Sequence, residues 1–347
     1  MNSGKHIFFF LLLLLPVISL SAQKIPSQKP RLIVGITVSG MRYDYLTVYW
    51  DRFGDDGFRK MAGTGTICRN ARYNSLVTES AVGYATIATG ASPETHGIAA
   101  DYWYERLKKQ VRFCVSDESV NTVGGSYEAG KYSPSALMMR TLSDELRVVS
   151  RFKSRVVGVS MDPKAAILLS GHTADEVFWI DPLKLTWTTS SFYQDSLPAW
   201  VDRFNKKDFP SVYLQEDWSP MLPLSEYSES MLDNNPYETG FNGQITFPYE
   251  MKRLSDKIRP NDHFNVLMAT PYGNTFTKDF AISAIVEEQL GKRGATDWIN
   301  INFSASKYLA DRYSTWSLET EDLYLRLDKD LSHLLEFLDS YIGLENV

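Results

Sequence analysis

A serine at the start of a predicted short helix is the first residue in this sequence that could do chemistry. Ser80 precedes a run of small residues, Ala81 to Thr89, which predicts a helix ended by Gly90. Free backbone N–H groups and the positive end of the helix dipole favour an anionic substrate and a developing alkoxide at such a position. The same serine also suits a plain N-cap, which stabilises a helix by about 1 kcal/mol. Taken alone, the motif favours the N-cap, and the catalytic interpretation stays open.

The elements that would position this serine alternate between strands and helices. Strands are predicted at residues 31–38, 66–73, 154–160, 165–170 and 297–303. Further helices are predicted at residues 41–61, 278–290 and 317–341. The first strand is apolar on both faces, as strands of parallel sheets are. This alternation predicts an α/β fold built on a sheet.

A central region of the chain departs from this pattern. Residues 178–189 predict a short hairpin, and a run rich in Trp, Tyr, Pro, Ser and Asp follows with little periodicity. We interpret residues 175–270 as a cap inserted into the sheet domain. The cap divides the α/β core into residues 23–174 and residues 271–347.

The first 22 residues predict a signal peptide rather than a part of the fold. An apolar run from Ile7 to Leu15 is broken by Pro16 and followed by small residues suited to a signal peptidase. The run is too short for a comfortable transmembrane helix, and no second stretch is long enough to span a bilayer. We therefore expect export to the periplasm, cell envelope or extracellular space, with no transmembrane segment after cleavage.

Charge and cysteine content exclude some classes of function. The chain has 36 Lys and Arg residues against 42 Asp and Glu residues, a formal charge of −6, so nucleic-acid binding is not expected. Its two cysteines, Cys68 and Cys114, form no zinc-binding pattern. In an oxidising compartment they could pair, or both could be buried free thiols, and the sequence leaves these alternatives open.

Segments that follow one another along the chain resemble the alkaline phosphatase superfamily. They are Val34 to Tyr45 (VGITVSGMRYDY), Arg52 to Phe58 (RFGDDGF), Tyr73 to Ile98 around Ser80, Gly171 to Asp175 (GHTAD), Thr270 to Asn274 (TPYGN), Lys278 to Ala281 (KDFA) and Glu321 to Asp328 (EDLYLRLD). Within the superfamily the chain is most similar to the secreted PafA-like phosphomonoesterases of bacterial envelopes, which are two-zinc enzymes. The resemblance implies a doubly wound, mostly parallel α/β sheet with helices on both faces and an inserted cap. It also implies hydrolysis of phosphate esters through a covalent phosphoenzyme.

The resemblance assigns roles to single positions. The nucleophile position, a threonine in these relatives, falls on Ser80, and Tyr84 replaces a histidine that usually follows the nucleophile. The metal-binding positions that the chain contains fall on Ser39, Lys307 and Asp311. The substrate-contacting positions fall on Asp101, Asp162 and Lys164.

These substitutions remove the donors that a metal site needs. Zinc is bound by carboxylate, imidazole or thiolate groups, usually three or four per ion, whereas the matched positions supply a hydroxyl, an ammonium and a carboxylate. The histidines are scattered, and we expect His96 and His172 to be structural. Asp101 and Asp162 stand where the family has a neutral donor and a cation, and each repels a phosphate dianion by about 1–4 kcal/mol at contact distance. We expect Lys307 to take the place of a metal ion and to pair with Asp311.

The sequence therefore predicts a pseudophosphatase with a binding or scaffolding role at the bacterial envelope. We expect it to need no cofactor and to bind an unidentified protein or small molecule. The alternative is a metal-dependent phosphomonoesterase or phosphodiesterase that uses Ser80 as nucleophile and zinc as cofactor. A lectin-like or peptide-binding cap is a third interpretation, which rests only on the aromatic content of residues 175–270. In the relatives, later metal ligands and a further core strand lie beyond position 347, so we expect a fragment of a longer chain or the product of a truncated gene.

Overall fold

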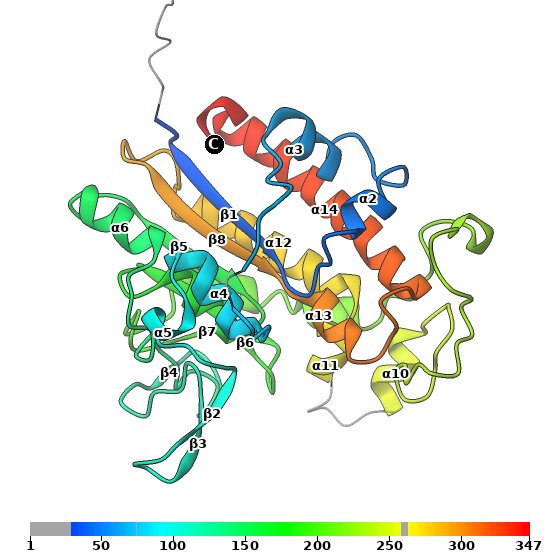
Figure 1. The fold of residues 1–347 in the computed structure, drawn as a ribbon, viewed down its shortest axis with the longest axis horizontal. Helices are drawn as coiled ribbons and strands as arrows, with labels where there is room; N and C mark the ends of the chain where they lie inside the picture. Colours follow the sequence, from blue (N-terminus) through cyan, green and yellow to red (C-terminus); the bar gives the residue numbers. More distant parts are fainter. Residues whose placement is uncertain (1–28, 74, 258–262) are drawn as a thin grey trace, which may run out of the picture.

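The computed structural model describes residues 29–73, 75–257 and 263–347, and the predicted signal peptide lies outside these ranges. A six-stranded sheet forms its centre (Figure 1). In spatial order its strands are β1 (Leu32–Val38), β8 (Asp297–Phe303), β5 (Val156–Ser160), β6 (Glu176–Asp181), β7 (Thr186–Ser190) and β4 (Thr122–Val123). The first four run parallel, whereas β7 and β4 pair antiparallel with their neighbours. A separate small sheet consists of β2 (Tyr102–Glu105) and β3 (Gln110–Phe113).

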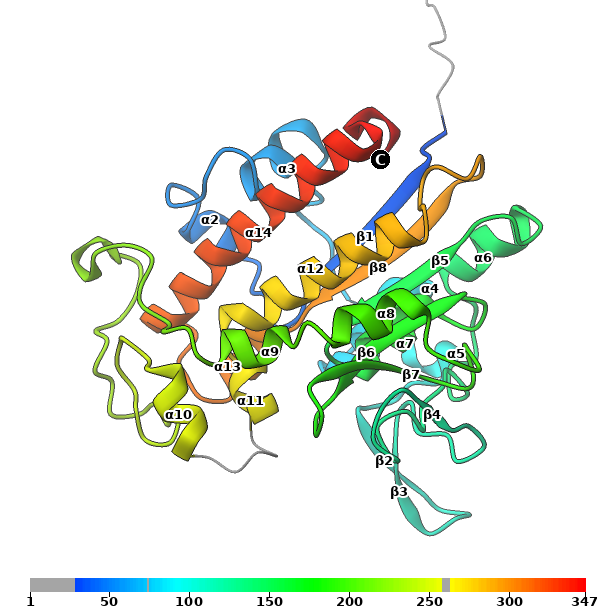
Figure 2. The same ribbon diagram turned by 180° about the vertical axis from the view of Figure 1, so that it is seen from behind.

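Helices cover both faces of the six-stranded sheet. One face carries α8 (Ala199–Asn205), α12 (Pro271–Glu287) and α14 (Leu318–Ile342), as Figure 2 shows. On the other face, α7 (Pro163–Ser170) packs against the strands and α4 (Ser80–Thr89) packs against α7; α4 lies in front of the sheet in Figure 1. Side chains of β6 alternate between the two layers, since Phe178 packs with the first set of helices and Val177 and Trp179 pack with the second. The fold is a doubly wound, mostly parallel α/β sheet, which confirms the prediction.

The remaining helices are short and lie around this core. They are α2 (Tyr45–Val48), α3 (Phe58–Thr64), α5 (Pro93–His96), α6 (Leu142–Val149), α9 (Phe209–Tyr213), α10 (Met251–Lys257), α11 (His263–Met268), α13 (Ala305–Ala310) and the 3-10 turns η2 (Leu224–Glu226) and η4 (Leu344–Asn346). Within the described ranges, no helix combines the length and apolar character needed to cross a bilayer.

The single helix predicted at residues 41–61 is wrong. The region holds α2 and α3 with turns between them. The carboxylate of Asp328 in α14 accepts hydrogen bonds from the backbone N–H groups of Gly54 (2.8 Å) and Phe58 (2.7 Å). Because Asp328 fixes these amides against α14, the chain bends there instead of continuing as one helix.

Two predicted strands do not form. Residues 165–170 belong to α7, because Asp162 caps its N-terminus by accepting a hydrogen bond from Lys164 N–H at 3.0 Å and Pro163 fits the first turn. A short apolar run does not by itself distinguish a buried helix from a strand. Residues 66–73 follow an irregular path with a local turn, so the strand predicted there is wrong as well.

The predicted cap begins too early. Residues 178–189 do form the predicted hairpin, as β6 and β7, but this hairpin belongs to the central sheet. Its side chains are buried on both faces, because α8 and α12 cover one side and α7 covers the other. The irregular part of the segment predicted as a cap therefore starts after Ser190.

Candidate functional site

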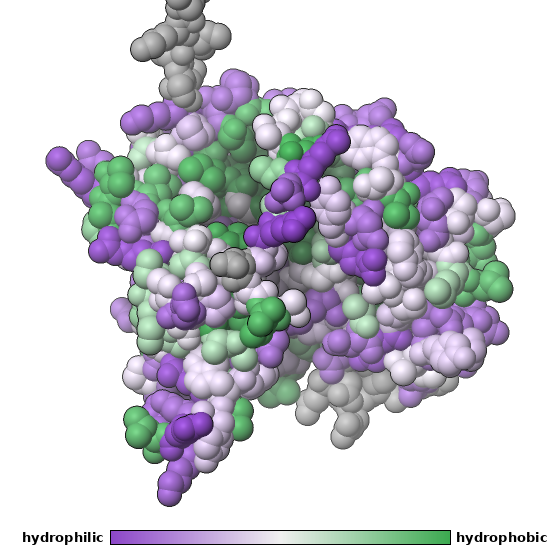
Figure 3. Space-filling view, viewed as in Figure 1, coloured by the Kyte–Doolittle hydropathy of each residue, from purple (hydrophilic) through white to green (hydrophobic). Residues whose placement is uncertain are grey.

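Three parallel strands end at the same edge of the sheet and bring polar residues there. Ser39 follows β1, Asp162 lies two residues after β5, and Lys307 lies in α13, directly after β8. Ligands of α/β folds bind outside the carboxyl ends of parallel strands. The face that carries α4 is hollowed near its centre, between α4 and the pair α2 and α3 (Figure 3). This edge is the candidate functional site.

Four charged side chains meet at this edge, and we call them the Lys–Asp quartet: Lys164, Lys307, Asp101 and Asp162. Lys164 Nζ donates a hydrogen bond to Asp101 Oδ2 and lies 3.6 Å from Asp162 Oδ2. Lys307 Nζ lies 3.4 Å from Asp162 Oδ2 and 3.9 Å from Asp101 Oδ2. The side chains of Asp162 and Lys164 are only 3% and 8% exposed. Two positive and two negative charges cancel, so the quartet is neutral as a unit.

Burial and charge pairing act on the pKa values of the quartet in opposite directions. Burial would lower the pKa of Lys164, but the charge of Asp162 and the hydrogen bond to Asp101 raise it above its usual value. Burial would raise the pKa of Asp101, yet the hydrogen bonds from Lys164 and from the Ala81 backbone bring it below its usual value. Burial lowers the pKa of Lys307; the charge of Asp162 raises it, but the charge of Lys164 lowers it, and the net shift is downward. Asp101 and Lys164 are therefore held as an ion pair at neutral pH.

The expected pairing of Lys307 with Asp311 is wrong. Lys307 contacts Asp162 and Asp101 instead, because its side chain points to the strand ends. Asp311 lines a separate hollow of about 240 Å³ together with Thr239, Asn265, Tyr308 and Arg312. Of the positions assigned by resemblance, Asp311 is thus the one that the structure places outside the quartet and its immediate neighbours.

Ser80 lies at the first residue of α4. The N-cap of this helix is Glu79, so the interpretation of Ser80 as the N-cap is wrong. The backbone N–H of Ala81 donates a hydrogen bond to Asp101 Oδ1 at 2.8 Å, and Asp101 N–H donates one to the Glu79 carboxylate. The N-terminus of α4 is therefore bound by a carboxylate of the chain itself.

Ser39 is held by a hydrogen-bond network that includes Asn302, a residue the sequence analysis did not single out. Asn302 Nδ2 donates to Ser39 Oγ (2.9 Å) and Thr37 Oγ1 (2.8 Å), and its Oδ1 accepts from Ser160 Oγ (2.9 Å). Tyr84 OH lies 2.5 Å from Ser39 Oγ. Asn302 is fully buried. The sequence did contain a signal for Asn302, namely an amide side chain within an otherwise apolar strand. Because buried polar groups are normally hydrogen-bonded, such a side chain indicates a local polar network.

The residues at this edge do not fit a zinc site. Ammonium groups offer no lone pair to a metal, and the two lysines already occupy the carboxylates of Asp101 and Asp162. The Ser39 hydroxyl is likewise engaged in hydrogen bonds. In the part of the chain that the structure describes, no three or more His, Cys, Asp or Glu side chains are grouped as a metal site.

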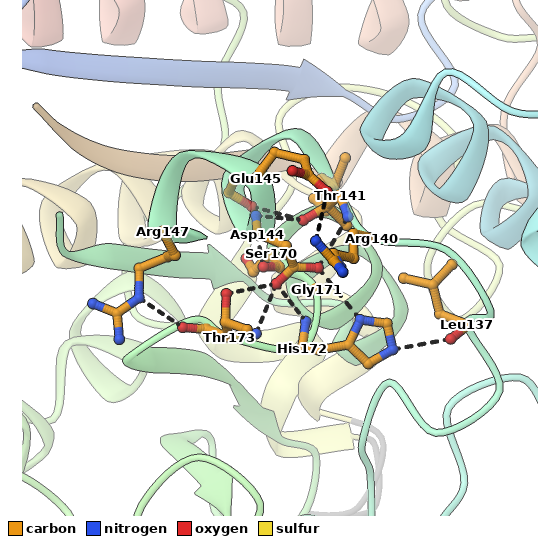
Figure 4. A network of polar contacts seen from close by, with 12 residues as sticks. Leu137, Arg140, Thr141, Asp144, Glu145, Arg147, Ser170, Gly171, His172 and Thr173 are labelled. Carbon is orange, nitrogen blue, oxygen red and sulfur yellow. Dashed lines mark hydrogen bonds and ion pairs between the residues drawn. The ribbon is translucent and has the colours of Figure 1, made fainter. Parts of the chain in front are cut away.

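Two histidines have structural roles, as expected. His96 is buried, with Nε2 3.1 Å from Thr86 Oγ1 and Nδ1 accepting the Ile98 N–H. Figure 4 shows His172 in a network around Asp144, where its Nδ1 lies 3.3 Å from Asp144 Oδ2. The hydrogen bond and charge of Asp144 raise the pKa of His172. Asp144 belongs to the capping box of α6, so the network holds a helix in place rather than an ion.

The cysteines are both free. Cys68 is exposed and Cys114 is buried. Neither of the two alternatives left open by the sequence is therefore right, since the thiols do not pair and only one is buried. Burial raises the pKa of the Cys114 thiol, as is typical of structural cysteines in a protein core.

Comparison with known proteins identifies the family. The model of the type I phosphodiesterase / nucleotide pyrophosphatase family matches residues 33–347, so the chain belongs to this family. It is 37% identical over 320 residues to alkaline phosphatase PhoV of Synechococcus elongatus, covering 92% of this chain and 57% of PhoV. It is 36% identical over 331 residues to alkaline phosphatase PafA of Elizabethkingia meningoseptica, covering 94% of this chain and 60% of PafA.

A solved structure supports the same relationship. The crystal structure of wild-type PafA superimposes with a TM-score of 0.87 at 35% identity, covering 91% of this chain and 61% of that one. The resemblance to the alkaline phosphatase superfamily and its PafA-like members is thereby confirmed. The chain spans less than two thirds of the length of these relatives.

Proposed function

We propose that this protein is a catalytically inactive member of its family, a pseudophosphatase that serves in binding or scaffolding. The single observation that carries the proposal is the neutral Lys–Asp quartet. Its two ammonium groups compensate two carboxylates of the same chain, which leaves no net charge to attract a phosphate ester or a cation. The ammonium groups are fixed in place by hydrogen bonds and burial, so they stay beside the carboxylates.

The nucleophile position also lacks activation. In the described ranges, no side chain makes a hydrogen bond to the Ser80 hydroxyl, and a serine attacks phosphorus poorly without a base or a metal ion that lowers its pKa. Asp101 adds a negative charge at the helix terminus where a substrate phosphoryl group would otherwise be stabilised. Each such carboxylate opposes a phosphate dianion by about 1–4 kcal/mol at contact distance.

A binding role has a candidate pocket beside the quartet. The separate hollow lined by Asp311 and Arg312 also includes Tyr308, the residue after Lys307, whose ring centroid lies 5.7 Å from Lys307 Nζ. A volume of about 240 Å³ suits a small polar molecule or one side chain of a partner protein. We propose that the protein acts after export, since its first 22 residues have the pattern of a signal peptide.

The second candidate function is hydrolysis of phosphomonoesters or phosphodiesters with Ser80 as nucleophile. It is favoured by the position of Ser80 at the N-terminus of α4 and by the alkaline phosphatases among the relatives. It would require zinc and a rearrangement of the quartet. The position of Ser80 at the helix N-terminus is evidence for neither a bound zinc ion nor such a rearrangement.

Metal content and turnover distinguish the two functions. The purified protein is incubated with zinc, dialysed and analysed for bound metal, and its hydrolysis of p-nitrophenyl phosphate and bis-p-nitrophenyl phosphate is measured. Ser80→Ala is the test variant and Ser211→Ala, at an exposed position of α9, is the matched control. We expect zinc well below one ion per chain and the same background rate for all three proteins. Stoichiometric zinc with hydrolysis that disappears only in Ser80→Ala would overturn the proposal.

A further inference from the structure

The Asp101 carboxylate has the surroundings of a bound anion. Its Oδ1 accepts the Ala81 N–H at the start of α4, and its Oδ2 accepts a hydrogen bond from Lys164 and lies 3.9 Å from Lys307 Nζ. A backbone amide at a helix start and two ammonium groups are donors that proteins use to bind phosphate and other oxyanions. Here these donors converge on a side chain of the chain itself.

The backbone holds Asp101 in this place. Its N–H donates to the Glu79 carboxylate, and its carbonyl accepts the Cys114 N–H at 3.0 Å. Asp101 directly precedes β2, whose pairing with β3 fixes the chain on the other side. The carboxylate is therefore positioned by the fold and not by a flexible surface loop.

We propose that Asp101 is the specificity-determining residue of this site, an internal anion that closes the site to phosphate and other oxyanions. The inference rests on the proposed function and deepens it, because it assigns the loss of phosphate binding to one side chain. The charges of the quartet sum to zero with Asp101 in place. Without the Asp101 carboxylate, two ammonium groups face Asp162 alone, and the remaining cluster carries one net positive charge.

The test uses two substitutions of Asp101 and inorganic phosphate as the probe. Asp101→Asn keeps the shape of the side chain and removes its charge, whereas Asp101→Ala also opens the space. Glu105→Gln is the matched control, because it removes one negative charge from the adjacent strand β2, where the half-buried Glu105 pairs with the exposed Lys108. Phosphate binding is measured by isothermal titration calorimetry at low ionic strength, after thermal denaturation has established that each variant is folded.

We expect at least one Asp101 variant to bind phosphate about tenfold or more tightly than the wild type, a change of about 1.4 kcal/mol. Glu105→Gln should bind phosphate like the wild type, and adding Lys164→Ala to Asp101→Ala should abolish the gain. Equal phosphate affinity of the wild type and both folded variants would overturn the inference. So would an equal gain in Glu105→Gln, since it would reflect overall charge.

A measurement on the wild type keeps the inference testable if neither variant folds. Crystals of the wild type are soaked in phosphate, and we expect no phosphate within hydrogen-bond distance of the Ala81 N–H. A phosphate bound there, with Asp101 displaced, would overturn the inference. Failure of the inference differs from failure of the proposed function, because the latter would appear as zinc-dependent, Ser80-dependent turnover by the wild type.

Discussion

Removal of the most deeply paired lysine tests how the quartet stabilises the fold. Lys164→Met replaces the ammonium group with an apolar group of similar length and leaves Asp101 and Asp162 with Lys307 as their remaining counter-charge. The substitution removes the attraction of Lys164 to Asp101 and to Asp162, and it also removes the repulsion between Lys164 and Lys307. The net loss is therefore about one attraction between opposite charges. A single pair of charges about 4 Å apart is worth about 4 kcal/mol at an effective dielectric constant near 20.

This value agrees with the roughly 3–5 kcal/mol that breaking a buried ion pair usually costs. We therefore expect Lys164→Met to lower the free energy of unfolding by about 3–5 kcal/mol. The corresponding decrease in Tm for a chain of this size is on the order of 10 °C. Lys108→Met is the matched control, because Lys108 is 60% exposed and pairs with the half-buried Glu105. Its effect should stay within about 1 kcal/mol.

A double-mutant cycle isolates the pair itself. Urea unfolding is followed by tryptophan fluorescence for the wild type, Lys164→Met, Asp101→Asn and the double variant. We expect a coupling energy of more than about 1 kcal/mol, with the double variant more stable than the sum of the single effects implies. Additive effects, within about 0.5 kcal/mol, would refute the reasoning, because they would mean that Lys164 and Asp101 do not stabilise one another.

Three further predictions concern other charged groups. Lys307→Ala should lower Tm less than Lys164→Met does, because the Lys307 side chain is 25% exposed and its contacts are longer; an unchanged Tm would count against its place in the quartet. The pKa of His172 is raised above its unfolded value by Asp144, so its stabilising contact is complete below about pH 6.5 and is lost as the pH rises through the folded pKa. His172→Gln should consequently lower Tm more at pH 5.5 than at pH 8.5, and equal losses would contradict this. Burial raises the pKa of Glu319 to about 8, whereas the unfolded chain releases this proton above about pH 4.3. The free energy of unfolding therefore falls as the pH rises from about 4.3 to about 8. Glu319→Gln should therefore raise Tm relative to the wild type at pH 8 but not at pH 4.5, as thermal melting would show, and a pH-independent difference would contradict the assignment.

The sequence predicted best the elements that have long, regular patterns. The strand at residues 297–303 matches β8, and the predicted helix at 317–341 differs from α14 by one residue at each end. Both patterns are set by local periodicity and burial, which the sequence displays directly. The single helix predicted at 41–61 is interrupted between α2 and α3, where the carboxylate of Asp328, more than 250 residues away, accepts hydrogen bonds from the backbone amides of Gly54 and Phe58.

Several residues of the candidate site were singled out from the sequence, but their arrangement and the buried Asn302 were not. The resemblance identified Asp101, Asp162, Lys164 and Lys307 as altered positions, yet it gave no reason to join them into one neutral cluster. Lys307 pairs with Asp162 across 145 residues of sequence because parallel strands bring their ends together. The expected partner Asp311 is a matched position about one helical turn after Lys307, and neither the match nor the spacing reports the direction of a side chain.

The most direct test of the central claim is a crystal structure of the wild type soaked in zinc, with the metal located by anomalous scattering. We predict no zinc within the Lys–Asp quartet and Lys164 Nζ still bonded to Asp101. A zinc ion coordinated by Asp101 or Asp162, with the lysines displaced from them, would contradict the account.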